Sequence, residues 1–369
     1  MITVLLGTRA QLIKMAPVIL ELENRGWQPR LILTGQHKET MDQLLADFAI
    51  QTAPQRIYEG KEVSGISDVV PWFLGCLWRL WRDSKIFFTV GDRPDQSVVL
   101  VHGDTFSTLL GALAGRLTGQ RVAHVESGLR SFNLWHPFPE ELTRLAVFRM
   151  AHLAFCPDNW AKSNLQGLQT VAVNTEGNTL LDALRVALAA GKPLPVKLPP
   201  SRFGVVSLHR FENIFKKERL LTILDLVEEA ATRFPLVFVL HPATRQNLEK
   251  FELLDRLVGN ERIQLCPRMG YFEFVGLLTR SSFVITDGGS NQEELSYLGK
   301  PTLLMRRATE RQEGLGSNVV LCEYQRAKLI EFFKGLGQYE SGQKDFPDRS
   351  PSARVVDALN EFVPVSLGN

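Results

Sequence analysis

Three carboxylates in the first half of the chain have the spacing of an acid–base site. Apolar runs at residues 98–101 and 122–125 are typical of buried strands; Asp104 lies just beyond the first run, and Glu126 directly follows the second. A proline-punctuated loop then carries Glu140. The carboxyl ends of parallel strands meet at one edge of a sheet, where open α/β sheets bind ligands. We therefore expect the three acids to share one reaction chamber.

A second candidate site lies in the other half of the chain, at residues 287–290. The sequence Asp-Gly-Gly-Ser there follows an apolar run at 283–286 and opens a helical segment, so glycine N–H groups and the helix end can hold an anion. Behind this cradle, Glu294 is placed to accept both hydroxyls of a ribose, whereas Glu293 could instead complement the helix dipole. The pattern predicts a bound nucleoside diphosphate.

Two strand-to-helix turns add cationic residues. Arg9 and Lys14 follow the first apolar run and would contact phosphate; because a full G-x-G-x-x-G fingerprint is absent, the alternative is a pair of solvated surface cations. His209 and Arg210 occupy the matching turn of the second half. A lone histidine is more often structural, but the neighbouring arginine and the anion cradle on the same sheet edge favour a functional His209.

Three roles are open to the acids of the first half, Asp104, Glu126 and Glu140, and the sequence favours one of them. They could be metal ligands, a general acid–base set, or loop acids that cap helices. Metal is disfavoured because the nucleotide has arginine and helix-dipole partners, and because no histidine-rich ligand spacing accompanies the acids. We expect general acid–base catalysis at Asp104, Glu126 and Glu140, with neither a metal nor a cofactor.

The elements that must position these residues alternate between strand and helix in both halves. Apolar strand-like runs are followed by helix-period segments in residues 2–151 and again in residues 204–305. That alternation predicts two parallel-sheet α/β domains that face one another across a ligand cleft. A proline-rich connector at 192–201 is the domain boundary that the residues alone indicate.

Length, charge and cysteine spacing exclude several protein classes. A chain of 369 residues exceeds one typical core, and 42 basic against 40 acidic residues leave a formal charge of +2, which argues against nucleic-acid binding. Four widely spaced cysteines encode neither a disulfide framework nor a zinc knuckle. No leader pattern opens the chain, and no apolar run approaches the roughly 20 residues of a membrane span. We expect a cytoplasmic protein without a transmembrane segment.

The segment 72–88 is rich in tryptophan and arginine at helical spacing. One line of this helix holds Trp72, Cys76 and Arg79, and another holds Leu74, Trp78 and Trp81. A core or subunit-interface helix is the plainer interpretation. The alternative is peripheral docking of residues 72–88 on a membrane surface or a partner protein.

In order and spacing, a series of motifs resembles the non-hydrolysing UDP-N-acetylglucosamine 2-epimerases. The motifs are GTRAQLIKMAPVI, TGQHKETMDQLL, VHGDTFSTLLGALAG, HVESGLRS, PFPEELTR, EGNTLLDAL, SLHRFEN and TDGGSNQEELSYLGKPTLLMRRATERQE. They cover the chain from Met1 to about Val320, apart from residues 51–96. The resemblance implies two Rossmann-like parallel-sheet domains facing across a cleft in a GT-B-like arrangement.

The family arrangement also implies a domain boundary earlier than the proline-rich connector. It predicts an N-terminal domain at 1–170 for the sugar and the catalytic acids, and a C-terminal domain at 171–350 for UDP. Residues 351–369 would form a helix that packs back on the N-terminal domain. The resemblance further implies a homodimer with a UDP-sugar substrate and no cofactor.

The activity that the resemblance implies is epimerisation at C2 of a UDP-N-acetylhexosamine, UDP-GlcNAc to UDP-ManNAc, which supplies activated sugars for cell-surface polysaccharide. The C2 proton is not next to a carbonyl, so a side-chain base cannot remove it directly. Loss of UDP from C1 creates an oxocarbenium-like centre that acidifies C2. The expected route is therefore anti elimination of UDP through a 2-acetamidoglucal, followed by re-addition.

The family's functional residues carry over position by position. Asp104, Glu126 and Glu140 match its catalytic acids, and His209 matches its catalytic histidine near the diphosphate. The residues that match or neighbour its substrate contacts are Arg9, Lys14, Arg144, Arg210, His241, Phe274, Gly289, Ser290, Glu294 and Arg311. Gln36 and His37 match a segment linked in bacterial members to allosteric activation by a second substrate molecule.

Two departures from the family pattern indicate a divergent branch. Ala10-Gln11 stands where the family has Pro-Glu, which removes an acid from the nucleotide side, and Gly288-Gly289-Ser290 stands for Ser-Gly-Gly. A modified UDP-HexNAc, such as a 2,3-diacetamido sugar, is an alternative substrate. A GT-B glycosyltransferase using the same UDP-sugar cleft and a non-enzymatic UDP-sugar sensor are further alternatives, which the retained acids and His209 disfavour.

Overall fold

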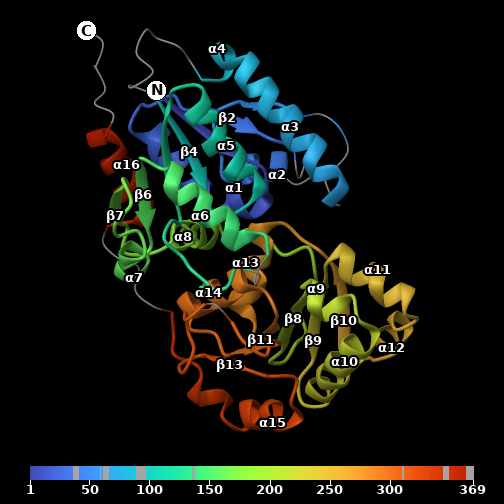
Figure 1. The fold of residues 1–369 in the computed structure, drawn as a ribbon. Helices are drawn as coiled ribbons and strands as arrows, with labels where there is room; N and C mark the ends of the chain where they lie inside the picture. Colours follow the sequence, from blue (N-terminus) through green and yellow to red (C-terminus); the bar gives the residue numbers. More distant parts are fainter. Residues whose placement is uncertain are drawn as a thin grey trace. The chain divides into compact units, whose positions relative to one another are not determined.

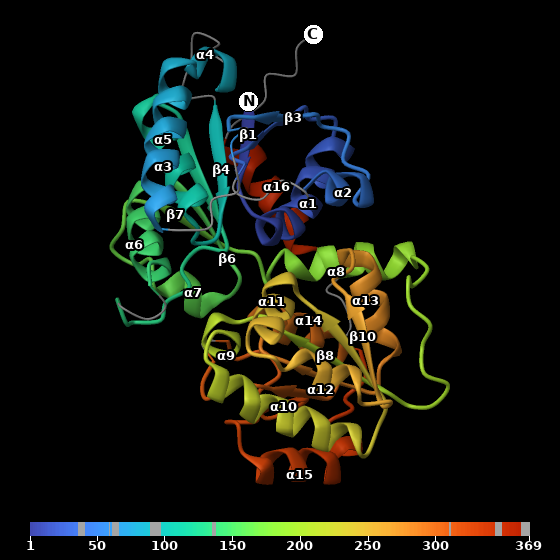
Figure 2. The same cartoon turned by 90° about the vertical axis from the view of Figure 1, so that its right-hand side faces the viewer.

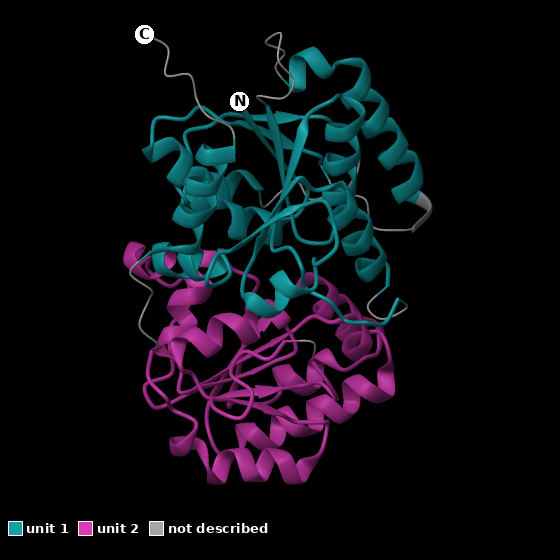
Figure 3. Ribbon diagram, turned by 60° about the vertical axis from the view of Figure 1, so that its left-hand side comes forward, with its two compact units in different colours: residues 1–186, 347–369 teal, residues 187–346 magenta. Residues whose placement is uncertain are grey.

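The structure is a computed structural model that describes residues 1–35, 41–58, 60, 66–88, 97–134, 138–309, 311–343 and 349–362 (Figure 1). Each half of the chain forms a parallel sheet with helices, so the predicted α/β class with two parallel-sheet domains is confirmed (Figure 2). The two compact units are Met1–Val186 with Pro347–Asn369, and Ala187–Phe346 (Figure 3). The chain changes unit after Val186 rather than after residue 170, because residues 171–174 pair with the first sheet.

Unit 1 is built on a seven-stranded sheet in the order β3-β2-β1-β4-β5-β6-β7. Its strands are β1 (Ile2–Leu6), β2 (Arg30–Leu33), β3 (Pro54–Arg56), β4 (Val98–His102), β5 (Arg121–Val125), β6 (Leu153–Cys156) and β7 (Val171–Asn174). Every residue of β1 and β4 is buried, as expected for central strands that helices cover on both faces. The strand order reverses between β1 and β4, and open α/β sheets bind ligands at such a switch point.

The helices of unit 1 lie on both faces of its sheet (Figure 2). They are α1 (Arg9–Asn24), α2 (Met41–Asp47), α3 (Ile66–Arg82), α4 (Ser84–Phe87), α5 (Phe106–Leu117), α6 (Glu140–Met150), α7 (Asn159–Ser163) and α16 (Pro351–Phe362), while α8 (Leu180–Ala190) leads into unit 2. α3 packs against α5 on one face, and α1 packs against α16 on the other. The last described helix thus completes the unit that the first strand begins.

Helix α3 is apolar on two sides. The residues that face the core are Trp72, Cys76 and Leu80, all buried among apolar side chains of the sheet and of α5. The residues of the opposite line, Val70, Leu74, Trp78 and Trp81, are all exposed. Half of the tryptophan-rich segment is therefore a core helix face, and the other half is an uncovered apolar line.

Unit 2 repeats the same plan with a six-stranded sheet in the order β10-β9-β8-β11-β12-β13. Its strands are β8 (Gly204–Leu208), β9 (Leu236–Leu240), β10 (Ile263–Pro267), β11 (Phe283–Thr286), β12 (Thr302–Leu304) and β13 (Val319–Leu321). Its helices include α9 (Phe211–Ile214), α10 (Lys217–Ala231), α11 (Pro242–Lys250), α12 (Leu254–Val258), α13 (Tyr271–Arg280), α14 (Gly289–Leu298) and α15 (Arg326–Lys334). The switch point of this sheet lies between β8 and β11.

Some predicted features can be compared only over the described residues. Within them, no helix combines the length and the apolar character needed to cross a membrane. The same part of the chain holds no cluster of three metal-ligating side chains. The expected allosteric residues Gln36 and His37 lie outside the described residues.

Candidate active site

The acids of the first half lie at the carboxyl edge of the unit 1 sheet. Asp104 comes just after β4, Glu126 directly follows β5, and Glu140 begins α6. The β4–β5 register pairs His102 with Val125, so the turn after β4 lies beside Glu126. Glu126 has a φ of 61°, in the left-handed region that a non-glycine residue keeps only where its surroundings hold it there. This backbone conformation sets the direction of its side chain.

The Glu126 carboxylate is buried among three polar side chains. Lys14 Nζ lies 2.6 Å from Glu126 Oε1, and Asn178 Nδ2 donates to the same oxygen over 2.7 Å. His102 Nε2 is 3.2 Å from Oε2, and burial lowers the pKa of His102 to about 3, so this imidazole is neutral at pH 7. The side chain of Lys14 is only 5% exposed, which excludes a solvated surface cation at this position.

Asp104 is held by Arg144 of α6. Arg144 Nη2 donates to Asp104 Oδ2 over 2.5 Å, while Nη1 donates to Glu141 Oε2 over 3.2 Å. Burial acts to lower the pKa of Arg144, but the Asp104 and Glu141 carboxylates outweigh it and raise that pKa. Arg144 therefore remains a cation that ties the acid after β4 to the start of α6.

Two adjacent glutamates at the start of α6 have different surroundings. Glu141 is fully buried and accepts hydrogen bonds from Arg130 Nε over 2.5 Å and from the Ser131 N–H over 3.0 Å. Burial acts to raise the pKa of Glu141, but these donors and Arg144 hold it below its usual range. Glu140 Oε2 is shielded from solvent and has no hydrogen-bond partner among the described residues.

Sequence reasoning singled out Glu140 and did not find the structural role of Glu141. The available signal was the Glu141-x-x-Arg144 spacing, which places the two side chains on one face of a helix. That spacing does not identify Arg130 as a further partner, because Arg130 comes from the loop before α6. Glu141 is thus a buried residue that anchors the loop before α6. Glu140 keeps one carboxyl oxygen without a hydrogen-bond partner among the described residues.

His124 supports the turn that carries Asp104. The sequence patterns did not predict this role. Its Nε2–H donates to the Gly103 carbonyl over 2.7 Å, and Ser127 Oγ lies 3.0 Å from its Nδ1. Only the neutral imidazole donates at one nitrogen and accepts at the other. Burial lowers the pKa of His124 to about 4, in agreement with this bonding. The turn is therefore fixed by a histidine that stays uncharged.

Gln11, one of the two departures from the family pattern, is buried and bonds within unit 1. Its Oε1 accepts the N–H groups of Gly7 and Thr8, and its Nε2 donates to the His102 carbonyl over 2.7 Å. An ionised glutamate could not make this donation. Gly7 is equally a packing residue, because a Cβ there would lie 1.8 Å from Ser107 Oγ.

In unit 2, Asp287 organises the switch point. This buried carboxylate accepts the backbone N–H groups of His209 and Arg210 over 3.0 and 3.1 Å, and Asn213 Nδ2 donates to it over 2.9 Å. Asp287 therefore points into the fold, and the donors that remain for an anion are the N–H groups of the glycines and of the helix end. Its bonds instead hold the backbone of the His209–Arg210 turn.

The part of the predicted anion cradle that can still bind an anion is the first turn of α14. Gly288 precedes this helix, and among the described residues no side chain caps the helix there. The N–H groups of the first turn, including those of Gly289 and Ser290, thus keep their positive potential for an anion. A Cβ at Gly288 would lie 2.8 Å from His209 Cε1, so the histidine ring lies directly against this turn.

The two glutamates of α14 lie beyond its first turn, and both are buried. Glu293 Oε2 accepts a hydrogen bond from Arg311 Nη1 over 2.5 Å, so it forms an ion pair rather than complementing the helix end. Gln292 holds the loop that carries this arginine, because its Nε2 donates to the carbonyls of Arg311 and Glu313 over 3.2 and 3.0 Å. Glu294, the expected ribose ligand, is 3% exposed.

The remaining predicted substrate contacts occur in both units. Arg9 begins α1 in unit 1 and is partly buried. In unit 2, His241 precedes α11, and the centroid of its ring lies 5.7 Å from that of His209. Phe274 lies in the first turn of α13 and is partly buried. His209, His241 and the first turn of α14 thus gather at one edge of the unit 2 sheet.

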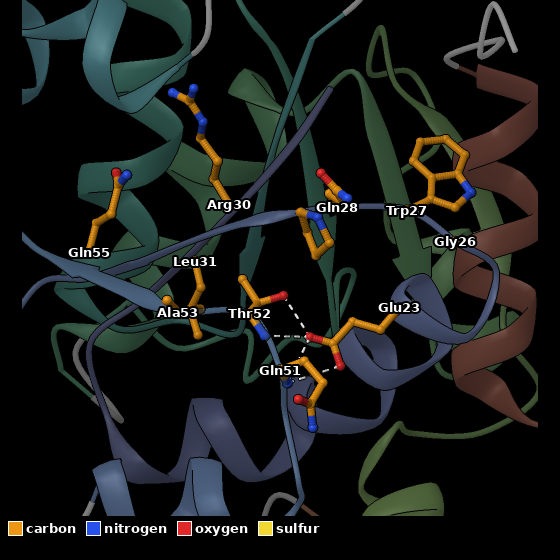
Figure 4. A pocket seen from close by; sticks show the side chains of 11 residues that line it. Glu23, Gly26, Trp27, Gln28, Arg30, Leu31, Gln51, Thr52, Ala53 and Gln55 are labelled. Atoms are coloured by element: carbon orange, nitrogen blue, oxygen red, sulfur yellow. Dashed lines mark hydrogen bonds between the residues drawn. The ribbon is translucent and has the colours of Figure 1, made fainter. Parts of the chain in front are cut away.

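A separate hollow of about 480 Å³ opens at the amino end of β2 (Figure 4). It is lined by Glu23, Gly26, Trp27, Gln28, Pro29, Arg30, Leu31, Gln51, Thr52, Ala53 and Gln55. Glu23 Oε1 accepts the Thr52 N–H over 2.7 Å and the Thr52 hydroxyl over 2.6 Å, so this carboxylate serves the local fold. Because the acids lie at the carboxyl edge of the sheet, we assign the hollow no part in their site.

Comparison with known proteins gives matches over nearly the whole chain. A family model described as UDP-N-acetylglucosamine 2-epimerase matches residues 20–360. The UDP-N-acetylglucosamine 2-epimerase of Methanocaldococcus jannaschii is 32% identical over 373 residues, 97% of this chain and 98% of that protein. That of Neisseria meningitidis is 33% identical over 351 residues, 90% of each protein.

Solved structures agree with these matches. The crystal structure of the Neisseria meningitidis UDP-GlcNAc 2-epimerase bound to UDP-GlcNAc is similar with a TM-score of 0.82 and 30% identity, covering 98% of this chain and 99% of that one. The Methanocaldococcus jannaschii enzyme in complex with UDP-GlcNAc and UDP gives a TM-score of 0.80 and 28% identity, with coverage of 98% and 99%.

Proposed function

The chain belongs to the UDP-N-acetylglucosamine 2-epimerase family of isomerases, whose fold is GT-B-like, and we propose that it interconverts UDP-N-acetylglucosamine and UDP-N-acetylmannosamine. The observation that carries the proposal is the Glu126 site. A buried carboxylate on a left-handed turn is paired with Lys14, and Asp104 at the end of the neighbouring strand is paired with Arg144. Acids held in this way are suited to proton transfer at a bound sugar.

The proposed reaction begins with departure of UDP. The bond from C1 to the diphosphate oxygen breaks, and UDP leaves with the bonding electron pair. A carboxylate takes the C2 proton, and the electrons of the C2–H bond form the C1=C2 double bond of a 2-acetamidoglucal. UDP then adds back to C1 while a second acid returns a proton to C2 from the opposite face, which inverts that carbon.

We assign the proton transfers to Asp104, Glu126 and Glu140 of unit 1. The local surroundings of Glu126 and Glu140 differ, because Glu126 accepts two donors whereas Glu140 Oε2 has none among the described residues. The proposed cycle needs one group that takes a proton and one that returns it, and the two acids differ in their hydrogen bonding.

We assign UDP binding to unit 2. The first turn of α14 offers N–H donors at Gly289 and Ser290 for the diphosphate, and His209 lies against that turn. Arg210, His241 and Arg311 would add positive charge, Phe274 an aromatic face, and Glu294 an acceptor for ribose hydroxyls. In unit 1, Arg9 and Lys14 stay in the proposed substrate set.

The proposal is tested by incubating the protein with UDP-GlcNAc in D2O and following C2 by NMR. We expect deuterium at C2 together with formation of UDP-ManNAc. A 2,3-diacetamido UDP-sugar is the second substrate to assay, because the Gly288-Gly289-Ser290 departure lies at the proposed diphosphate site. Transfer of the sugar to an acceptor would identify a glycosyltransferase, and absence of exchange with every UDP-HexNAc would overturn the proposal.

The matched variant for this assay is Glu126→Gln. The amide cannot take a proton, so we expect turnover to fall by about 100-fold or more. UDP affinity, measured by calorimetry, should change little because we assign the nucleotide to unit 2. A large loss of UDP affinity in Glu126→Gln would show that this residue belongs to the nucleotide site instead.

We also propose that the protein is a homodimer and that the exposed line of α3 is its contact surface. The line consists of Val70, Leu74, Trp78 and Trp81. It would bury on the order of 500 Å² of surface on each copy. The total buried by the two copies is then near the lower limit for a stable interface. Light scattering should show a dimer that a Trp78→Ser, Trp81→Ser variant converts to a monomer. Vesicle binding by a wild-type monomer would favour the membrane alternative.

The cellular role that we propose is supply of an activated N-acetylmannosamine for cell-surface polysaccharide. In a strain without this protein, the surface polysaccharide should lack sugars that derive from N-acetylmannosamine. An unchanged surface composition would contradict this role while leaving the C2 chemistry to the exchange assay.

A further inference from the structure

Asn178 belongs to the EGNT sequence at 176–179, a motif for which the proposed reaction has no role so far. It lies in the connection between β7 and α8, and it is 7% exposed. Its amide bonds at both ends: Oδ1 accepts the Leu180 N–H over 3.0 Å, and Nδ2 donates to Glu126 Oε1 over 2.7 Å. The backbone donor at Leu180 requires the amide oxygen, which leaves the NH2 group facing Glu126.

Two different kinds of group contact Glu126 Oε1: the charged ammonium of Lys14 and the neutral amide of Asn178. Lys14 supplies the charge to Oε1 from a long, flexible side chain of α1. Asn178 reaches the same oxygen from a side chain that is itself anchored to the start of α8. The neutral His102 lies near Oε2. Asn178 therefore supplies a directed donor to Oε1, and Lys14 supplies the charge.

We propose that Asn178 is a positioning residue that orients the Glu126 carboxylate for proton transfer at C2. This inference rests on the proposed epimerase function, and it assigns Asn178 a role that acts through Glu126. Without the amide donor, the carboxyl group can rotate about its last side-chain torsion, which is broad and soft. A reacting atom displaced by about 1 Å can cost on the order of 100-fold in rate.

The local backbone does not need the amide donation of Asn178. Thr175, three residues before Asn178, donates its N–H and its hydroxyl to the Cys156 carbonyl over 2.8 and 2.9 Å. The Thr175 hydroxyl also lies 2.8 Å from the Gly177 carbonyl. These contacts and the Leu180 bond hold the connection, so the contact between Asn178 Nδ2 and Glu126 is the one that a purely structural role leaves unexplained.

Two substitutions of Asn178 separate its bond to the Leu180 N–H from its contact with Glu126. Asn178→Asp keeps an acceptor for the Leu180 N–H but replaces the donor with a second carboxylate beside Glu126. Asn178→Ser keeps a capping oxygen and is too short to reach Glu126, without adding charge. We expect kcat for C2 exchange to fall about 100-fold in both variants, with KM and UDP affinity within about twofold of wild type. The thermal unfolding temperature of Asn178→Ser should stay close to wild type, whereas that of Asn178→Asp should fall because two buried carboxylates then face each other.

The matched control is Asn174→Ser at the end of β7, where the connection begins. Asn174 Nδ2 donates to Asn159 Oδ1 at the surface, so this change should leave kcat as it is. Wild-type kcat in Asn178→Ser or Asn178→Asp would overturn the assignment of Asn178 alone. Equal losses in Asn174→Ser would do the same, because they would indicate a general effect of the connection. Absence of exchange in the wild-type protein would overturn the function and this inference together.

Discussion

At the scale of single residues, surroundings decide role more than residue type does. Glu140 and Glu141 are adjacent and chemically identical, yet Glu141 is buried against Arg130, Ser131 and Arg144. Glu140 has a shielded oxygen without a partner among the described residues. Glu141 holds a loop to a helix, and Glu140 is the one of the two that we propose for proton transfer.

Because their surroundings differ, the change from glutamate to glutamine should lower stability at Glu141 and turnover at Glu140. Glu141→Gln removes the buried charge that two partly buried arginines face, so unfolding free energy should fall by about 3 kcal/mol. Glu140→Gln should change stability little but lower turnover by about 100-fold. All six tryptophans lie in residues 27–160, so tryptophan fluorescence in urea reports on unit 1. A reversed pattern would show that the two roles have been exchanged.

The buried histidines of unit 1 predict a pH dependence of stability. Burial lowers the pKa of His102 to about 3 and that of His124 to about 4, whereas both titrate near 6.5 in the unfolded chain. Between these values the unfolded state binds more protons, so stability is full above pH 6.5 and is lost as pH falls toward 4. Each histidine contributes a slope of up to about 1.4 kcal/mol per pH unit.

The measurement is urea unfolding followed by tryptophan fluorescence at pH 7.5, 6, 5 and 4.5. A His124→Gln variant should have a lower stability at pH 7.5 and a flatter decline with acid, because one of the two proton-linked groups is gone. An identical slope in the variant would mean that other groups cause the acid sensitivity.

At the scale of elements, the catalytic candidates sit where strands give way to helices. The turn after β8 is bound to the end of β11 through Asp287, and it holds His209 against Gly288 at the start of α14. Unit 1 uses the same position differently, because Gln11 of α1 bonds to the His102 carbonyl at the end of β4. In each unit, a buried polar side chain joins the two strand ends at the switch point.

The contact between His209 and α14 predicts the effect of Gly288→Ala. Gly288 has an ordinary φ of −78°, so alanine strains no backbone, but its Cβ would lie 2.8 Å from His209 Cε1. The histidine ring is partly exposed and can move aside, so stability should change little. Turnover should fall about 10- to 100-fold because the ring leaves its place. Gly337→Ala, where a Cβ meets open space, is the control; full activity of Gly288→Ala would contradict the assigned role of His209.

At the scale of the whole molecule, the chain returns from unit 2 to complete unit 1. Helix α16 buries Val355, Val356 and Leu359, and Asp182 Oδ2 accepts the Ser352 N–H at its start over 2.8 Å. Arg25, which directly follows α1, donates to Asp357 over 2.7 Å. The EGNTLLDAL motif therefore serves unit 1 twice, through Asn178 at Glu126 and through Asp182 at α16.

This closure predicts that damage to α16 stays within unit 1. Leu359→Ala should lower the stability of unit 1 by about 3 kcal/mol because it leaves a cavity in a buried helix face. Hydrogen exchange should then quicken in peptides of β1 and α1 and remain as in wild type in β8 and β11. The exposed Glu361→Ala is the matched control. Faster exchange throughout unit 2 would show that α16 stabilises more than unit 1.

Local sequence patterns were enough to predict the α/β class, the two parallel sheets and the strand ends that carry Asp104, Glu126 and His209. Apolar runs and their polar ends are local patterns, so they can be read along the chain. Only the tertiary structure decided that Lys14 and Asn178 meet at Glu126, that Asp287 turns inward and that Gln11 serves the fold. These contacts join residues far apart in the chain, and strand register and burial, which no local pattern contains, set them.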